Sequence, residues 1–205
     1  MSIFEKGNYK TVPSEFRTFG IASLEELSKF QEKFEIYDTD TTINAIRDAI
    51  IANYLGFDLL NFDKHGFDAK KSADNQFLEV KQCSVSSESW GGTWNDTNEE
   101  KALAFSDERL FTVVAVWKGA SDLQFMVYAQ NAALGEHLHR LVVNRKEGSR
   151  STQSVPIQKL IKDFNFTVIC PPDKSKEYVL KLLVNYKKTI INDVQLYNIK
   201  TLRDI

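Results

Sequence analysis

Charged residues with the spacing of a hydrolytic site lie in the segment 66–82, which reads GFDAKKSADNQFLEVKQ. Glu79 and Lys81 are two positions apart, so on a β-strand their side chains point to the same face. Asp68 precedes Glu79 by eleven positions, and a turn over the SADN residues 72–75 would bring it opposite that pair. The spacing therefore predicts a β-hairpin that gathers two carboxylates and one ammonium group.

This set of groups suits the hydrolysis of a phosphodiester bond. The carboxylates of Asp68 and Glu79, with the backbone carbonyl of Val80, are the hard oxygen ligands that Mg²⁺ prefers, and the metal would polarise the phosphate and activate a water. Lys81 would position that water, help to deprotonate it and stabilise the charge of the phosphorane. An exposed ion pair on a hairpin would have the same spacing, but the apolar neighbours of this pair favour the hydrolytic interpretation.

Periodic apolar patterns before and after the hairpin predict the elements that position it. Ser23 and Glu26 resemble a capping box at the start of the first helix, and Gly56 supplies the stop of the second. The segment 84–98, with its serines, glycine pair and two tryptophans, is expected to be an irregular loop. The predicted helices are 23–34, 42–55, 132–143, 155–163 and 176–187, and the predicted strands are 66–71, 76–83, 110–117, 123–129 and 166–170.

This order of elements predicts an α/β fold with a mixed central sheet of about five strands flanked by helices. At 205 residues the chain is long enough for one well-packed domain. We expect a single domain (1–205), with an N-terminal helical extension (1–40), a catalytic core (41–170) and a C-terminal helix and tail (171–205).

The pair Phe67-Asp68 followed by Glu79-Val80-Lys81 resembles the PD-(D/E)xK nuclease superfamily, with Phe in place of the loosely kept Pro. The resemblance extends over the element order of residues 41–170. It implies a restriction-endonuclease-like core and a requirement for Mg²⁺, for which Mn²⁺ can substitute. In that superfamily the helix before the hairpin often donates an acid, and matching helix to helix places Asp48 there. An exposed helix acid would look the same, and Asn44 is its rival one turn earlier.

Several residues outside the motif are candidate DNA contacts. In segment 139–162 six basic residues stand against the single acid Glu147, in a chain whose formal net charge is −2. Arginine and lysine there can pair with base edges or phosphates, although a solvated surface would carry the same charge. Trp94 could stack on bases, or it could anchor the loop on the core. The candidates are Lys70, Gln82, Ser84, Trp94, Arg145, Lys146 and Arg150.

The resemblance and the size of the chain together favour a type II restriction endonuclease acting on double-stranded DNA. Such an enzyme is expected to be a homodimer that matches a palindromic site, and a cognate DNA methyltransferase is expected in the same cell. The alternatives are a structure-selective repair or junction nuclease, and a non-catalytic DNA-binding domain on the same fold.

The remaining composition indicates a reducing environment. Cys83 and Cys170 lie in apolar, strand-like stretches and are expected to be buried free thiols. No apolar run approaches the ~20 residues that span a bilayer, and the first residues lack a signal-peptide pattern. We therefore expect a cytoplasmic protein without a membrane partner.

Overall fold

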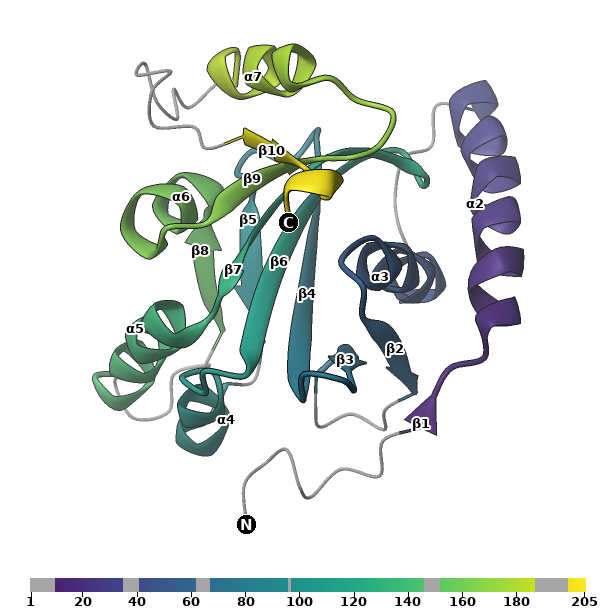
Figure 1. The fold of residues 1–205 in the computed structure, drawn as a ribbon. Coiled ribbons are helices and arrows are strands. Elements are labelled where there is room, and N and C mark those ends of the chain that lie inside the picture. The colour runs from purple at the N-terminus through teal and green to yellow at the C-terminus, as the bar shows by residue number, and fades with distance from the viewer. Residues whose placement is uncertain (1–9, 35–40, 62–66, 96, 146–151, 187–198) are drawn as a thin grey trace.

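The computed structural model describes residues 10–34, 41–61, 67–95, 97–145, 152–186 and 199–205 (Figure 1). Within these residues the central sheet has eight strands in the order β1-β2-β3-β4-β6-β7-β9-β10. The neighbours β4/β6 and β9/β10 are parallel and the other pairs are antiparallel. The strands are β1 (Lys10–Thr11), β2 (Asp58–Asn61), β3 (Ala69–Lys71), β4 (Gln76–Ser84), β6 (Leu110–Lys118), β7 (Asp122–Gln130), β9 (Thr167–Cys170) and β10 (Ile199–Thr201).

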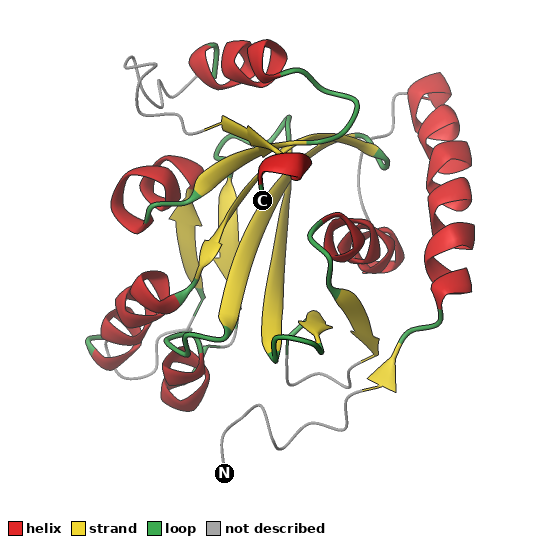
Figure 2. Cartoon of the chain, viewed as in Figure 1, coloured by secondary structure: helices red, strands yellow, loops and turns green. Residues whose placement is uncertain are grey.

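Helices cover both faces of this sheet, which confirms the predicted α/β class (Figure 2). Leu78 and Val80 of β4 belong to the core on one face, with α2 (Ser14–Phe34) and α3 (Thr41–Tyr54). Phe77 belongs to the core on the other face, where α5 (Ala132–Val143), α6 (Ile157–Phe164) and α7 (Lys176–Val184) pack. The described chain ends in a short 3₁₀ helix, η2 (Leu202–Asp204).

The sheet has more strands than the five that we expected. β1, β2 and β10 are two to four residues long. Alternation over so few positions cannot be told apart from chance, so these strands leave no pattern in the sequence.

A second, two-stranded antiparallel sheet is formed by β5 (Gly91–Trp94) and β8 (Gln153–Pro156), and we call it the β5–β8 ribbon. The expectation that 84–98 is irregular is therefore wrong for residues 91–94. The helix expected over 155–163 begins two residues later, because Ser154 and Val155 pair with β5 and Pro156 is the N-cap.

Two helix ends show how local signals succeeded and failed. Gly56 follows α3 with a φ of 74°, as a left-handed stop requires. Ser23, by contrast, lies inside α2 and donates its hydroxyl to the carbonyl of Phe19, so the predicted cap is wrong and the helix begins at Ser14, after Pro13. The short helix α4 (Glu99–Ala104), capped by the side chain of Asn98, was not predicted.

Candidate active site

The predicted hairpin is formed by β3 and β4, with Asn75 at a φ of 50° in the turn between them. Asp68 directly precedes β3, and its backbone N–H donates to the carbonyl of Leu78 at 2.9 Å. β3 pairs with β4 only as far as Leu78, and beyond that residue none of the described strands pairs with the same edge of β4. The side chain of Asp68 takes the place of a strand there, because its Oδ2 accepts the N–H of Val80 at 2.6 Å.

Glu79 and Lys81 lie side by side next to that carboxylate. The Lys81 ammonium donates to Oε1 of Glu79. Glu79 is only 5% exposed, so this ion pair is not the solvated surface pair that the same spacing would allow. The structure thus brings the three motif residues Asp68, Glu79 and Lys81 together.

Asp48 joins this group from α3. The side-chain amide of Gln82 donates one hydrogen bond to Oδ1 of Asp48 and another, at 2.9 Å, to the backbone carbonyl of Asn44. Asp48, Asn44, Lys81 and Gln82 all line an open pocket of about 220 Å³ between α3 and the free edge of β4. The helix acid therefore lies at the same edge as Asp68.

The charges of these groups influence one another. Burial raises the pKa of Asp68 to about 7, and the charge of Glu79 adds to the rise. Burial and the nearby Asp68 likewise raise the pKa of Asp48 well above its usual range. Burial alone would lower the pKa of Lys81, but Glu79 and Asp68 outweigh it and the net change is a rise. Three carboxylates thus lie around the Lys81 ammonium, while Lys101 also lowers the pKa of Asp68 and Arg47 also interacts with the charge of Asp48. A bound cation would relieve the repulsion among the carboxylates.

These side chains are not arranged as a preformed metal cluster. In the parts of the chain that the structure describes, no group of three His, Cys, Asp or Glu side chains is placed so that it could hold a metal ion. The bonds described above engage one oxygen each of Asp48, Asp68 and Glu79. Because the N–H and C=O of a strand residue point the same way, the carbonyl of Val80 faces the edge on which Asp68 lies.

The predicted DNA contacts that the structure describes lie partly at this pocket and partly elsewhere. Ser84 lines the pocket, and its hydroxyl bonds that of Ser86 at 2.8 Å. Lys70 is partly buried, with its Nζ 5.4 Å from the centroid of the Phe77 ring. Gln82 is bound to α3, so its amide N–H groups are directed to protein acceptors. Arg145 is exposed just after α5, and Lys146 and Arg150 lie outside the described residues.

Trp94 is not available to DNA. Its side chain is 1% exposed in the core below the β5–β8 ribbon, so the prediction that it stacks on bases is wrong. Trp90 is also buried, and it stacks on Tyr186 at 3.8 Å between ring centroids. The Tyr186 hydroxyl accepts the N–H of Trp90 and donates to the carbonyl of Glu88. The loop is therefore anchored on the core, which is the alternative that the sequence left open.

Arg47 is a site-lining residue that the sequence did not single out. It precedes Asp48, and its guanidinium donates to the carbonyls of Gly119 and Ala120 in the β6–β7 turn. It also lies 4.8 Å from the centroid of the Trp117 ring, and burial lowers its pKa to about 10. Arg47 thus fixes α3 to the sheet, and a buried cation in a helix has no sequence pattern that would reveal this role.

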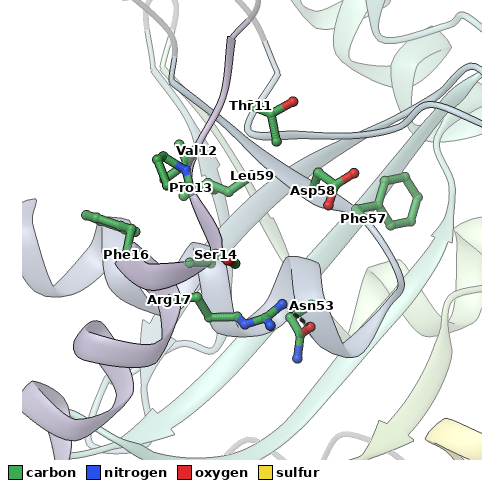
Figure 3. Close-up of a pocket in the computed structure, with 11 residues that line it drawn as sticks. Thr11, Val12, Pro13, Ser14, Phe16, Arg17, Asn53, Phe57, Asp58 and Leu59 are labelled. Atoms are coloured by element: carbon green, nitrogen blue, oxygen red, sulfur yellow. Dashed lines mark hydrogen bonds between the residues drawn. The ribbon is translucent and has the colours of Figure 1, made fainter.

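A second pocket, of about 180 Å³, lies on the far side of α3, where the start of α2 meets β2 (Figure 3). Arg17 donates to the side-chain oxygen of Asn53 across it. Asp58 is the one acidic residue among those that line it. A single exposed acid offers no pair of groups for acid–base chemistry or for a metal, so this pocket is not the candidate active site.

Comparison of the chain with protein-family models and with curated proteins found no match. In the described parts of the chain no helix combines the length and the apolar character needed to cross a bilayer.

Proposed function

We propose that this protein is a Mg²⁺-dependent endonuclease that hydrolyses phosphodiester bonds of double-stranded DNA, and that it is a type II restriction enzyme with a restriction-endonuclease-like core. The observation that carries the proposal is the convergence of Asp48, Asp68, Glu79 and Lys81 at the unpaired edge of β4. Acidic groups and one ammonium from three elements rarely meet in this way without a chemical task.

The donors present fit a hard divalent cation. Asp68, Glu79 and the carbonyl of Val80 would hold it, and Asp48 would add a carboxylate from α3. The raised pKa values of Asp48 and Asp68 support this fit, because a cation would relieve the repulsion that raises them. When bound, Mg²⁺ or Mn²⁺ supplies Lewis acidity toward a phosphate oxygen and lowers the pKa of a water.

Lys81 has two tasks in this proposal. Its ammonium, which donates to Glu79, would orient the attacking water and stabilise the negative charge of the phosphorane. Its raised pKa keeps it protonated at neutral pH, so its first contribution is electrostatic stabilisation. Asp68 is oriented for its own task by the N–H of Val80.

A restriction enzyme cuts both strands of a short palindromic site, which a two-fold homodimer matches with one active site for each strand. Arg145, Lys70 and Ser84, with Lys146 and Arg150, remain our proposed DNA contacts. A cognate methyltransferase would protect the DNA of the same cell.

The test is cleavage of plasmid DNA with Mg²⁺ by the wild type and by the variants Asp68→Asn, Glu79→Gln and Lys81→Met. Each substitution keeps the size of the side chain, and we expect each to lower the cleavage rate at least about 100-fold while DNA binding survives. Asp74→Asn is the matched control, because Asp74 is an exposed acid in the turn of the same hairpin.

Discrete fragments would support sequence-specific cleavage, and cuts confined to branched or damaged DNA would favour the structure-selective alternative. Cleavage that is equally fast in EDTA would contradict a metal-dependent mechanism. A protein that binds DNA and cuts none under any metal condition would be the non-catalytic domain.

A further inference from the structure

The β5–β8 ribbon has two different faces. Its inner face is apolar, with Trp94 and Val155 each 1% exposed. On the outer face Thr93 and Ser154 are direct partners in the register, both are exposed, and their hydroxyl oxygens lie 3.1 Å apart. The ribbon therefore presents a pair of hydroxyl groups to solvent.

The ribbon lies close to the candidate active site. It packs on the face of the sheet that carries α5 and α6 (Figure 1). A Cβ added at Gly92 would lie 3.2 Å from Cγ2 of Val114, so the ribbon touches β6 at that residue. Val114 is the register partner of Lys81 in the neighbouring strand β4. The hydroxyl pair is thus carried by an element that rests one strand away from Lys81.

The chemistry of the outer face fits the edges of bases. Besides Thr93 and Ser154, the outward positions of the two strands are Gly91 and Pro156, and the exposed residues just beyond them are Asn95 and Thr152. None of these six carries a carboxylate that would repel a phosphate. Hydroxyl and amide groups both donate and accept hydrogen bonds, as base edges in the major groove require.

The shape fits the same partner, because the major groove of B-DNA admits a two-stranded antiparallel ribbon. A protein partner fits less well. The cores of protein interfaces are enriched in aromatic residues and depleted in serine, and this face has no aromatic or branched aliphatic side chain.

We propose that the outer face of the β5–β8 ribbon reads base pairs in the major groove, with Thr93 and Ser154 as specificity-determining residues. The inference rests on the proposed action on double-stranded DNA and assigns its sequence preference to an element outside the motif.

The test uses the full chain carrying Thr93→Val and Ser154→Ala, which remove both hydroxyl groups. The matched control carries Thr18→Val and Ser23→Ala, two exposed hydroxyl residues of α2, which covers the opposite face of the sheet. Each protein selects duplexes from a random-sequence pool with Ca²⁺ in place of Mg²⁺, and the bound duplexes are sequenced. Cleavage with Mg²⁺ is measured in parallel.

We expect the ribbon variant to bind random duplex as the wild type does, since its phosphate contacts are intact. Its preference for the selected base should fall about tenfold at one or two positions, and the α2 control should keep the full preference.

Three results would overturn the proposal: an unchanged preference in the ribbon variant, a wild type that selects no sequence, or a loss of dimers in light scattering, which would assign the face to a second copy of the chain. Because the selection needs no cleavage, it decides the role of the ribbon separately. If the wild type selects a sequence but cuts no DNA, the nuclease is refuted, and the loss of preference in the ribbon variant still decides the role of the ribbon.

Discussion

Replacing Gln82 by methionine tests whether this residue acts through Asp48. Methionine keeps the length of the side chain and removes both amide hydrogen bonds, the one to the Asp48 carboxylate and the one to the Asn44 carbonyl. The first loss affects an acid proposed to hold the metal. The second affects only the attachment of α3 to β4.

The magnitudes follow from these two bonds. A neutral hydrogen bond contributes about 1 kcal/mol to stability and one to a charged group about 1.5–3 kcal/mol. Because Gln82 is half-buried, hydrogen bonds to water replace part of the energy of the two lost bonds. We therefore expect the unfolding free energy to fall by about 2 kcal/mol, or Tm by about 4–8 °C. The bond from Gln82 also lowers the pKa of Asp48, so its removal lets that pKa rise further. Protons then compete more strongly with the metal, and the Mg²⁺ concentration for half-maximal cleavage should rise about tenfold.

A double-mutant cycle with Asp48→Asn separates the two effects. In the Asp48→Asn chain, Gln82→Met should still lower Tm, because the bond to Asn44 is lost, but it should no longer change the Mg²⁺ requirement. Gln130→Met is the control, since its amide also donates to a backbone carbonyl, that of Glu108, at the far end of β7. If Gln82→Met raises the Mg²⁺ requirement by the same factor with and without the Asp48 carboxylate, Gln82 does not position Asp48 and the reasoning is wrong.

Three further predictions concern stability. Gly135→Ala and Gly20→Ala both gain about 1 kcal/mol of helix propensity, but a Cβ at Gly135 would lie 2.2 Å from the backbone of Phe105 whereas one at Gly20 meets a side chain. Calorimetry should therefore give Gly135→Ala a Tm lower by about 4–8 °C than that of Gly20→Ala, and equal values would contradict the close α4–α5 contact. Because the pKa of Asp68 is raised to about 7, its ionisation destabilises the folded state by an amount that is absent below about pH 4 and complete above pH 7. In EDTA the unfolding free energy of the wild type should thus fall more than that of Asp68→Asn between about pH 5 and about pH 8. If urea titrations show the same change with pH for both proteins, the prediction is wrong. Arg47→Met leaves two turn carbonyls without their donor and should lower the unfolding free energy by about 2–3 kcal/mol in the same titrations. An unchanged midpoint would show that these hydrogen bonds do not hold α3 in place.

The hairpin and its flanking helix could be predicted from the sequence because their signals are local. Glu79 and Lys81 share a face through the period of a strand, and the turn-forming residues 72–75 fix which residues pair. The α3 helix follows from its apolar stripe and from Gly56. Asp48 was predicted as a site residue by matching this helix to the corresponding helix of a nuclease superfamily. The hydrogen bond from Gln82 gives a physical basis for its position.

Long-range pairings could not be predicted in the same way. Trp94 was placed in a loop because its strand partner, Gln153, is far along the chain, and a four-residue strand without its partner resembles a loop. The contact between Gln82 and Asp48 also joins two elements whose relative placement no single segment encodes. Both cases depend on tertiary packing, which decides what a polar or aromatic side chain meets.

The stack of Tyr186 on Trp90 has a consequence for shortened versions of the protein. Tyr186 follows α7, yet its ring and hydroxyl contact the loop that leads from β4 into β5. A fragment that ends before Tyr186 would lose this anchor, and the freed loop would become a preferred site of proteolytic cleavage. The segment expected as a C-terminal helix and tail is therefore part of what keeps the ribbon in place, and expression fragments and fusion points should leave it intact.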